Sequence, residues 1–380
     1  MNPQLEEQQV DIQATPPASA ARICVQGEPS SPTMAWFASG VEQEMKSRGH
    51  ISVPADEEPT FVLNLTKASR PRAFRRNSQG TFVASVIEVD HEPAEILKEA
   101  YPLLIRSMSN LLIYITRGLS GMRTHFVTLE QGYYTIEDAQ GDDAGYFREV
   151  YERLAPLATT RLVINNEFRP DLPPELWQGN ERTRALMDAG RRLDDMNLLP
   201  ASFPIEELLG TRDMSHLRRL FGIGGLSYGN LSVREDADSF WMTARGVNKG
   251  NLKDIGRDVL LIRDYNPDNH AMVVSVPPNV EPRAASVDAV EHWCLYEMHP
   301  EIGAIIHVHA WLEGVASTRV NYPCGTRELA QEVAELVAEA PDPSRTVVGL
   351  KNHGLTITGH SLEDIFDRIE GKILRTVPME

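Results

Sequence analysis

Residues 285–309 read ASVDAVEHWCLYEMHPEIGAIIHVH and predict a helix over 286–299 followed by a strand. The apolar, β-branched residues before His307 are typical of the end of a buried strand. On a strand, His307 and His309 project to the same face. Two imidazoles on one face commonly hold a transition metal, although two surface histidines would give the same pattern.

A further histidine lies in the segment VVGLKNHGLTITG, residues 347–359. VVGL predicts another apolar strand, and His353 follows it at a turn. The glycine after the histidine allows a sharp bend that presents the ring. His353 is therefore a candidate third metal ligand, or alternatively a turn residue at a strand end.

Asp288 lies near the start of the predicted helix 286–299. Asp288 and His292 are four residues apart and share one helical face. The helix dipole favours a carboxylate at this end. Asp288 could act as a proton shuttle or as a fourth metal ligand, or it could simply be a favourable helix-start residue.

Two glycine-rich turns adjoin strand-like segments, GGLSYGNLSVR at 224–234 and FWMTARGVNKGNL at 240–252. Such turns expose backbone N–H groups and small hydroxyls, which suit a phosphate or a carboxylate. Glycine turns are also common without any ligand.

The first half of the chain predicts an α/β domain over residues 21–180. Strands are expected at 22–27, 61–65, 81–89, 110–117, 125–137 and 161–168, and helices at 33–48, 93–109 and 143–156. No nucleotide-binding glycine loop is present. Residues 1–20 predict a disordered tail, 169–180 a linker, and 181–380 a second domain, so the fold class expected is α/β with two domains.

Four arginines lie in the loop SRPRAFRRNSQG of the first half, at Arg70, Arg72, Arg75 and Arg76. Guanidinium groups match the geometry of phosphate and carboxylate, so the loop could hold an anion. The alternative is an ordinary solvated loop on an acidic protein.

Composition narrows the function classes. The chain has 380 residues, 37 basic and 54 acidic, with a net charge of -17. Such a charge disfavours non-specific binding to nucleic acids and to anionic membranes. No apolar run is long enough to span a bilayer, and the first residues do not resemble a signal peptide. Three cysteines give no disulfide framework, so a cytoplasmic protein is expected.

The order and spacing of these motifs in 181–380 resembles the class II aldolase/adducin family, which includes sugar-phosphate aldolases, epimerases and dehydratases. The resemblance implies a three-layer αβα domain with a mainly antiparallel sheet, and a homo-oligomer, for which a tetramer is the common form in the family. It implies a metal site, most often Zn²⁺ with Mn²⁺ or Fe²⁺ as alternatives, on His307, His309 and His353. It implies an acid/base at Asp288, and substrate-phosphate contacts at Asn230, Gly246 and Ser286.

The chain departs from the family pattern at several positions. Asp288 replaces a glutamate, and Val287 replaces a phosphate-binding serine. Arg245 stands where a small hydroxyl residue is usual, and a guanidinium suits a substrate carboxylate at least as well as a phosphate. The segment between HVHAW and YPCGT is shorter than the usual loop of the family. In the aldolases a tyrosine of the C-terminal tail can act as the proton donor, and this sequence shows no equivalent tyrosine.

The resemblance therefore predicts a metal-dependent lyase acting on a small hydroxy-carbonyl substrate, either a sugar phosphate or a hydroxy-keto acid. Aldolase-type C–C cleavage, dehydration and decarboxylation all pass through an enediolate that a metal stabilises. Two alternatives are a non-catalytic interaction protein like adducin, expected to lack the histidines, and a non-haem iron oxygenase on the same scaffold.

Overall fold

The computed structural model describes residues 20–78, 80–118, 121–129, 131–163, 165–201, 203–221 and 227–380. The predicted disordered tail, apart from Ala20, lies outside the described residues, as do Gly224 and Gly225 of the first glycine turn. Among the helices described, none is long and apolar enough to cross a membrane.

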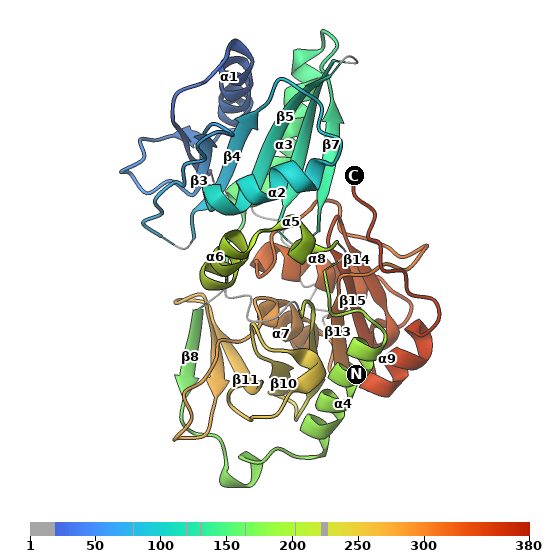
Figure 1. The fold of residues 1–380 in the computed structure, drawn as a ribbon. Helices are drawn as coiled ribbons and strands as arrows, with labels where there is room; N and C mark the ends of the chain where they lie inside the picture. Colours follow the sequence, from blue (N-terminus) through green and yellow to red (C-terminus); the bar gives the residue numbers. More distant parts are fainter. Residues whose placement is uncertain are drawn as a thin grey trace, which may run out of the picture.

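The first half of the chain forms a seven-stranded sheet, here called the N-terminal sheet, in the order β2-β1-β3-β4-β5-β6-β7 (Figure 1). The first five strands in this order pair in parallel and the last two pair antiparallel. The strands are β1 (Arg22–Gln26), β2 (Ile51–Ser52), β3 (Phe61–Leu65), β4 (Phe82–Glu88), β5 (Leu111–Gly118), β6 (Gly121–Thr128) and β7 (Tyr133–Glu137).

Helices cover both faces of the N-terminal sheet. α1 (Pro32–Ser47) and α3 (Asp143–Thr159) pack together on one face, and α2 (Ile96–Ser107) lies on the other. Because side chains alternate along a strand, Val86 of β4 joins the core under α1 and α3, whereas Ile87 joins the core under α2. The α/β character expected from the sequence is confirmed.

The segment 125–137 was predicted as one strand, and this is wrong. It contains the end of β6, a turn, and β7, which pairs with β6 antiparallel. Gly132 has φ +106°, a left-handed value that glycine adopts without steric cost. In the sequence, only the short polar stretch EQG at 130–132 separates the two apolar segments, so the turn is easily overlooked.

The second half forms an eight-stranded mixed sheet, here called the C-terminal sheet, in the order β14-β15-β13-β9-β10-β11-β12-β8. Neighbouring strands pair antiparallel, except that β8 pairs with β12 in parallel. The strands are β8 (Asn165–Arg169), β9 (Asn230–Arg234), β10 (Phe240–Thr243), β11 (Val259–Asn266), β12 (Ala271–Ser275), β13 (Ala304–Val308), β14 (Val347–Leu350) and β15 (Gly354–Gly359).

The strand predicted at 161–168 thus belongs to the C-terminal sheet as β8, although the sequence grouped it with the first domain. Its side chains are largely exposed, so its place is determined by backbone pairing with β12 rather than by an apolar pattern. Nearby, Val163 N–H donates to the carbonyl of Gly325 at 2.7 Å. Residues 161–169 are therefore attached to the second half of the chain.

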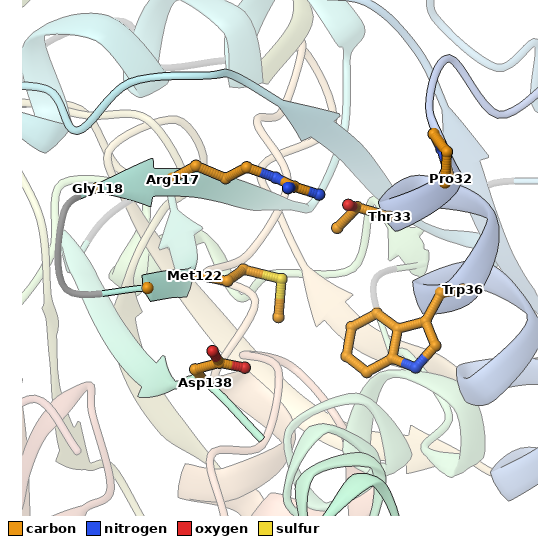
Figure 2. Close-up of a pocket in the computed structure, with 8 residues that line it drawn as sticks. Pro32, Thr33, Trp36, Arg117, Gly118, Met122 and Asp138 are labelled. Atoms are coloured by element: carbon orange, nitrogen blue, oxygen red, sulfur yellow. The ribbon is translucent and has the colours of Figure 1, made fainter. Parts of the chain in front are cut away.

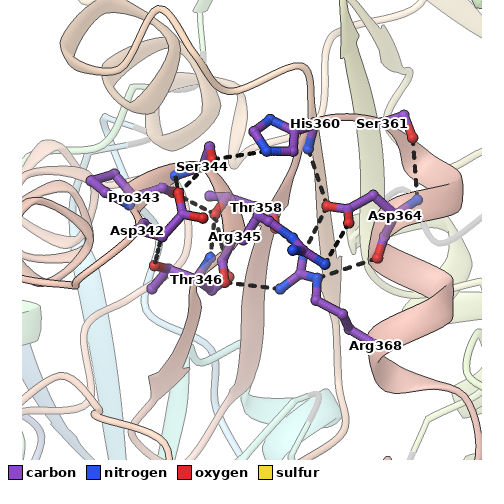
Figure 3. A network of polar contacts seen from close by, with 10 residues as sticks. All are labelled: Asp342, Pro343, Ser344, Arg345, Thr346, Thr358, His360, Ser361, Asp364 and Arg368. Atoms are coloured by element: carbon purple, nitrogen blue, oxygen red, sulfur yellow. Dashed lines mark hydrogen bonds and ion pairs between the residues drawn. The ribbon is translucent and has the colours of Figure 1, made fainter.

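Helices lie on both sides of the C-terminal sheet. α4 (Glu181–Asp195) contacts α9 (Leu362–Ile369) on one side, and α7 (Ala289–Met298) contacts α8 (Arg327–Ala338) on the other (Figure 1). At the far end of β15 from His353, Arg345 pairs with Asp364, and Arg368 bonds the carbonyl of Arg345 (Figure 3). This network holds α9 against β14 and β15. The short helices are η1 (Pro174–Leu176), η2 (Lys249–Asn251) and η3 (Pro343–Arg345).

Two helices, α5 (Ile205–Leu208) and α6 (Thr211–Phe221), lie between the two sheets (Figure 1). Ile205 and Leu217 share one buried cluster with Leu104 of α2. Arg106 of α2 also forms a bidentate ion pair with Asp213 of α6, at 2.7 and 3.1 Å. The N-terminal sheet and α2 are therefore joined to α5 and α6 by a common apolar cluster and a salt bridge.

Candidate metal centre

Three histidines meet at one end of the C-terminal sheet. His307 lies on β13, His309 follows that strand, and His353 lies in the turn between β14 and β15. The turn is tight: Asn352 has φ +53°, and a Cβ at Gly354 would lie 2.3 Å from the carbonyl oxygen of Val308. Only glycine fits at that position, so the turn brings His353 against β13, as the sequence suggested.

The three imidazoles are buried and converge. One ring nitrogen from each lies within 4.8 Å of the others, and the Nε2 atoms of His309 and His353 are 3.2 Å apart. Burial lowers the pKa of all three rings, and that of His309 and His353 falls well below the ordinary value. The imidazoles are therefore neutral near pH 7, which is the form that binds metals.

The donor atoms fit a divalent transition metal. His307 Nδ1–H donates to the carbonyl of Leu355 at 3.0 Å, and this leaves Nε2 with its lone pair. That Nε2 is buried and has no hydrogen-bond partner. A cation between the rings would satisfy it, and a hydrogen bond behind a ligating ring is the usual support for such a site. The Cys324 thiol also lies close, with Sγ 3.4 Å from His353 Nε2.

Asp288 stands beside this cluster. It occupies the N-cap of α7, but its side chain makes no capping hydrogen bond. Instead Asp288 Oδ2 accepts from Asn230 Nδ2 at 2.7 Å, and Oδ1 is buried with no hydrogen-bond partner in the described part of the chain. Asn230 pairs in register with His307 on the neighbouring strand. Asp288 thus stands at the helix start, as expected, while its carboxylate bonds Asn230 instead of the helix backbone.

A second buried acid, Glu291, lies one helical turn further along α7. Its Oε1 accepts from the hydroxyl of Thr356, which pairs in register with His307. Burial, and then the charge of Asp288, raise the pKa of Glu291 to about 8. The sequence analysis missed this residue because a glutamate on a helix is usually exposed. Its spacing from Asp288 is the signal that could have found it.

His292 completes the buried polar face of α7. Its Nδ1 lies 2.7 Å from the hydroxyl of Ser232, which also contacts the hydroxyl of Tyr296 at 2.9 Å. Burial lowers the pKa of His292 to about 3, so the ring stays neutral. His292, which was predicted to share a helical face with Asp288, is therefore part of a hydrogen-bonded group with Ser232 and Tyr296 in the core.

The second glycine turn lies beside the segment that carries Ser286. Arg245 N–H donates to the carbonyl of Ala284 at 2.8 Å, and Gly246 has φ +68°. Arg245 is exposed and Ser286 half-buried, whereas Asn230 is fully buried. Lys249, from the same turn, is buried, and its charge lowers the pKa of His307 and His309. Sequence reasoning had singled out no role for this lysine.

The arginine loop of the first half does not contribute to this centre. Arg76 donates to the carbonyl of Met108 at 3.0 Å and to Asn110 Oδ1 at 2.7 Å. Arg70, Arg72 and Arg75 are exposed. One member of the predicted cluster is therefore a structural residue that ties the loop to α2.

A surface hollow of about 530 Å³ lies on the N-terminal sheet, between α1 and the ends of β5 to β7 (Figure 2). Trp36, Arg117, Met122 and Asp138 line it. None of its lining residues belongs to the histidine cluster. A smaller hollow of about 460 Å³ lies beside Trp177 and Arg257, also without a site residue.

Residues 213–319 match the family model described as Class II Aldolase and Adducin N-terminal domain. A methylthioribulose-1-phosphate dehydratase of Leptospira biflexa is 30% identical over 111 residues, which are 29% of this chain and 49% of that enzyme. The chain thus spans about half the length of the curated relatives it matches.

Two solved structures are similar at low identity. An L-fuculose 1-phosphate aldolase is 19% identical with a TM-score of 0.35, covering 50% of this chain and 81% of its own. An aldolase II superfamily protein from Pseudomonas syringae is 17% identical with a TM-score of 0.35, covering 52% and 73%. The likeness to the class II aldolase/adducin family is thus carried by residues 213–319, which match the family model, and by the partial match to the dehydratase.

Proposed function

We propose that this protein is a metal-dependent lyase that acts on a small hydroxy-carbonyl substrate. The observation that carries the proposal is the convergence of three buried, neutral imidazoles beside a buried carboxylate with an unpartnered oxygen. Such a set suits proton transfer next to a Lewis acid, and the match to the class II aldolase/adducin family supports it.

His307, His309 and His353 would hold the metal, which when bound polarises oxygens of the substrate and stabilises the negative charge that develops on them. Zn²⁺ is the first candidate, and Mn²⁺ or Fe²⁺ also fit an imidazole set. Protein ligands number three in this arrangement, as in catalytic zinc sites that keep a position open.

Asp288 would move the proton. The hydrogen bond from Asn230 fixes Oδ2, so the free Oδ1 is the atom that accepts. Glu291, with its pKa raised to about 8, keeps its proton near neutrality and adds no second negative charge beside Asp288.

We assign substrate binding to Asn230, Arg245, Gly246 and Ser286, with Asn230 acting through Asp288. Arg245 and the turn at Gly246 lie next to the segment of Ser286, so together they offer one guanidinium, backbone N–H groups and a hydroxyl. This chemistry takes a phosphate or a carboxylate. The substrate class is accordingly a sugar phosphate or a hydroxy-keto acid.

The proposal includes the arrangement of the whole protein. We propose a cytoplasmic homo-oligomer, with a tetramer as the first candidate, in which each chain has an N-terminal α/β domain and a three-layer class II aldolase-like domain. The shared cluster of α2, α5 and α6 supports the packing of α5 and α6 against the N-terminal domain.

The test is metal analysis of the full-length protein purified without chelator, followed by a turnover screen. We expect about one zinc or manganese ion per chain and loss of that metal in His307→Ala, because two ligands retain little affinity. His360→Ala is the control, since His360 is exposed at the far end of β15. Stoichiometric metal in His307→Ala would contradict the site, and stoichiometric iron with oxygen-dependent turnover would favour the oxygenase.

A further inference from the structure

One residue of the N-terminal sheet reaches the histidine cluster. Gln131, in the turn between β6 and β7, lies with Nε2 3.4 Å from His309 Nδ1. Its backbone N–H donates to the hydroxyl of Thr128 at 3.2 Å, and Gly132 follows with φ +106°. These features of Thr128 and Gly132 hold Gln131 with its side chain toward the other half of the molecule.

The two ring nitrogens of His309 face different groups. Nε2 faces His353 Nε2 at 3.2 Å and so points into the cluster, whereas Nδ1 faces Gln131. A neutral imidazole that offers Nε2 to a cation carries its proton on Nδ1 and needs an acceptor there. His307 has this arrangement, with the carbonyl of Leu355 as the acceptor.

The amide of Gln131 can supply the acceptor. Its oxygen and nitrogen have nearly the same shape, so a rotation of the amide group by half a turn exchanges them. Gln131 Oε1 is buried and, among the residues that the structure describes, has no hydrogen-bond partner in the present orientation. After the rotation, Oε1 accepts from His309 Nδ1–H. The Tyr228 ring packs on the same imidazole, 5.4 Å between ring centres, and belongs to the cluster shared with α2.

We propose that Gln131 is a positioning residue of the metal centre, which accepts a hydrogen bond from His309 Nδ1–H and fixes the tautomer that presents Nε2 to the ion. The inference rests on the metal centre proposed above. It gives the N-terminal sheet a role in the site, because the second half of the chain alone would leave the Nδ1 side of His309 without this acceptor.

The experiment uses the full-length protein and measures zinc affinity by chelator competition, together with the visible absorption spectrum of the Co²⁺ form. Gln131→Met keeps the length of the side chain but removes the acceptor, whereas Gln131→Glu restores it. Arg106→Ala is the control, because it breaks the ion pair between α2 and α6 without touching a histidine.

We expect Gln131→Met to weaken zinc binding by about 10–100-fold and to alter the Co²⁺ spectrum, as loss of a partner behind a ligand does. Gln131→Glu should bind within a few-fold of wild type or more tightly, and Arg106→Ala should retain the wild-type affinity and spectrum. If Gln131→Met does not fold, Gln131→Leu takes its place with the same expectation.

Wild-type affinity and spectrum in the Met or Leu variant would overturn the inference and leave the metal centre standing. An equal loss in Arg106→Ala would also overturn it, because the effect would then come from packing between the sheets. A wild-type protein that binds no zinc would instead refute the proposed metal centre, and the role of Gln131 with it.

Discussion

At the scale of single residues, Asp288 is the most direct test of the proposed chemistry. Asn230 fixes one of its carboxylate oxygens, and the other oxygen has no partner among the described residues. Asp288→Asn should keep metal and fold, since the amide is nearly the same size, but it cannot accept a proton at neutral pH. We expect turnover to fall by about 100-fold to 10,000-fold, the range for a positioned acid or base.

Asp288→Glu is the companion variant, because it moves the carboxylate one methylene further from the backbone. If the short side chain is matched to the substrate, this variant also loses native turnover while keeping its metal. Turnover within a few-fold of wild type in both variants, measured with metal content and melting temperature on the same samples, would exclude Asp288 as the base.

Glu291 gives the protein a specific pH dependence of stability. Its pKa is raised from 4.5 to about 8, so between these values the folded state holds a proton that the unfolded state has lost. Stability from this group is therefore complete below pH 4.5 and is lost as the pH rises through 8. Glu291→Gln should remove this loss, because the amide stays neutral at every pH.

The measurement is the melting temperature of metal-free protein between pH 5 and 8. A difference of one pKa unit is worth about 1.4 kcal/mol, which is roughly 3 °C for a domain of 150–250 residues. We expect the melting temperature of Glu291→Gln, relative to that of wild type, to be about 3 °C or more higher at pH 8 than at pH 5. Glu297→Gln is the control on the exposed face of α7, and an equal gain there would contradict the assignment.

The strand that carries His307 and His309 and the turn at His353 could be predicted from the sequence because each is a local feature, whereas the grouping of the three histidines came from the resemblance to the family. His307 and His309 share a face of one strand, and the glycine after His353 indicates a turn. The spacing of Glu291 from Asp288 indicates a shared helical face, but the burial of Glu291 and its bond with Thr356 depend on tertiary structure, as does the contact of Gln131 with His309. The prediction of a single strand over 125–137 also placed Gln131 inside a strand, whereas it lies in a turn.

At the scale of elements, periodic segments were predicted within a few residues of their observed ends. FVLNL became β3 and the helix expected at 93–109 became α2, because burial on both faces and helical spacing are properties of the segment itself. The side of the molecule to which a segment belongs is not such a property. The exposed side chains of β8 carry no information about which sheet its backbone joins.

Arg76 links two elements of the N-terminal sheet and offers a test of its structural role. It donates to the carbonyl of Met108 at the end of α2 and to Asn110, which also accepts from the N–H of Val83. Arg76→Ala leaves these carbonyls without a charged donor, so we expect a loss of about 1.5–3 kcal/mol in the free energy of unfolding.

Arg75→Ala is the matched control one residue away, because Arg75 is exposed. Its effect should stay within about 0.5 kcal/mol, as for most surface substitutions. Urea unfolding of the two variants gives both values. Equal losses in Arg75→Ala and Arg76→Ala would show that the loop contributes through its overall charge.

At the scale of the whole molecule, each half of the chain contributes residues that pack or pair with the other half. The first half supplies Gln131 to the histidine cluster, and residues after α3 supply β8 to the other sheet. In the reverse direction, Met379 packs against the core under α1 and α3. The sequence boundary near residue 180 therefore lies after the chain has already entered the C-terminal sheet.

The position of β8 has a practical consequence for anyone who isolates the second half. A protein of residues 181–380 would expose the backbone N–H and C=O groups of β12 that β8 normally pairs, and an open strand of this kind recruits other chains. A protein of residues 160–380 retains β8, which pairs with β12. Light scattering should show concentration-dependent self-association of the shorter protein well beyond that of the longer one. Multimers of the shorter protein would then result from the artificially exposed edge of β12 and would give no information about the native oligomer.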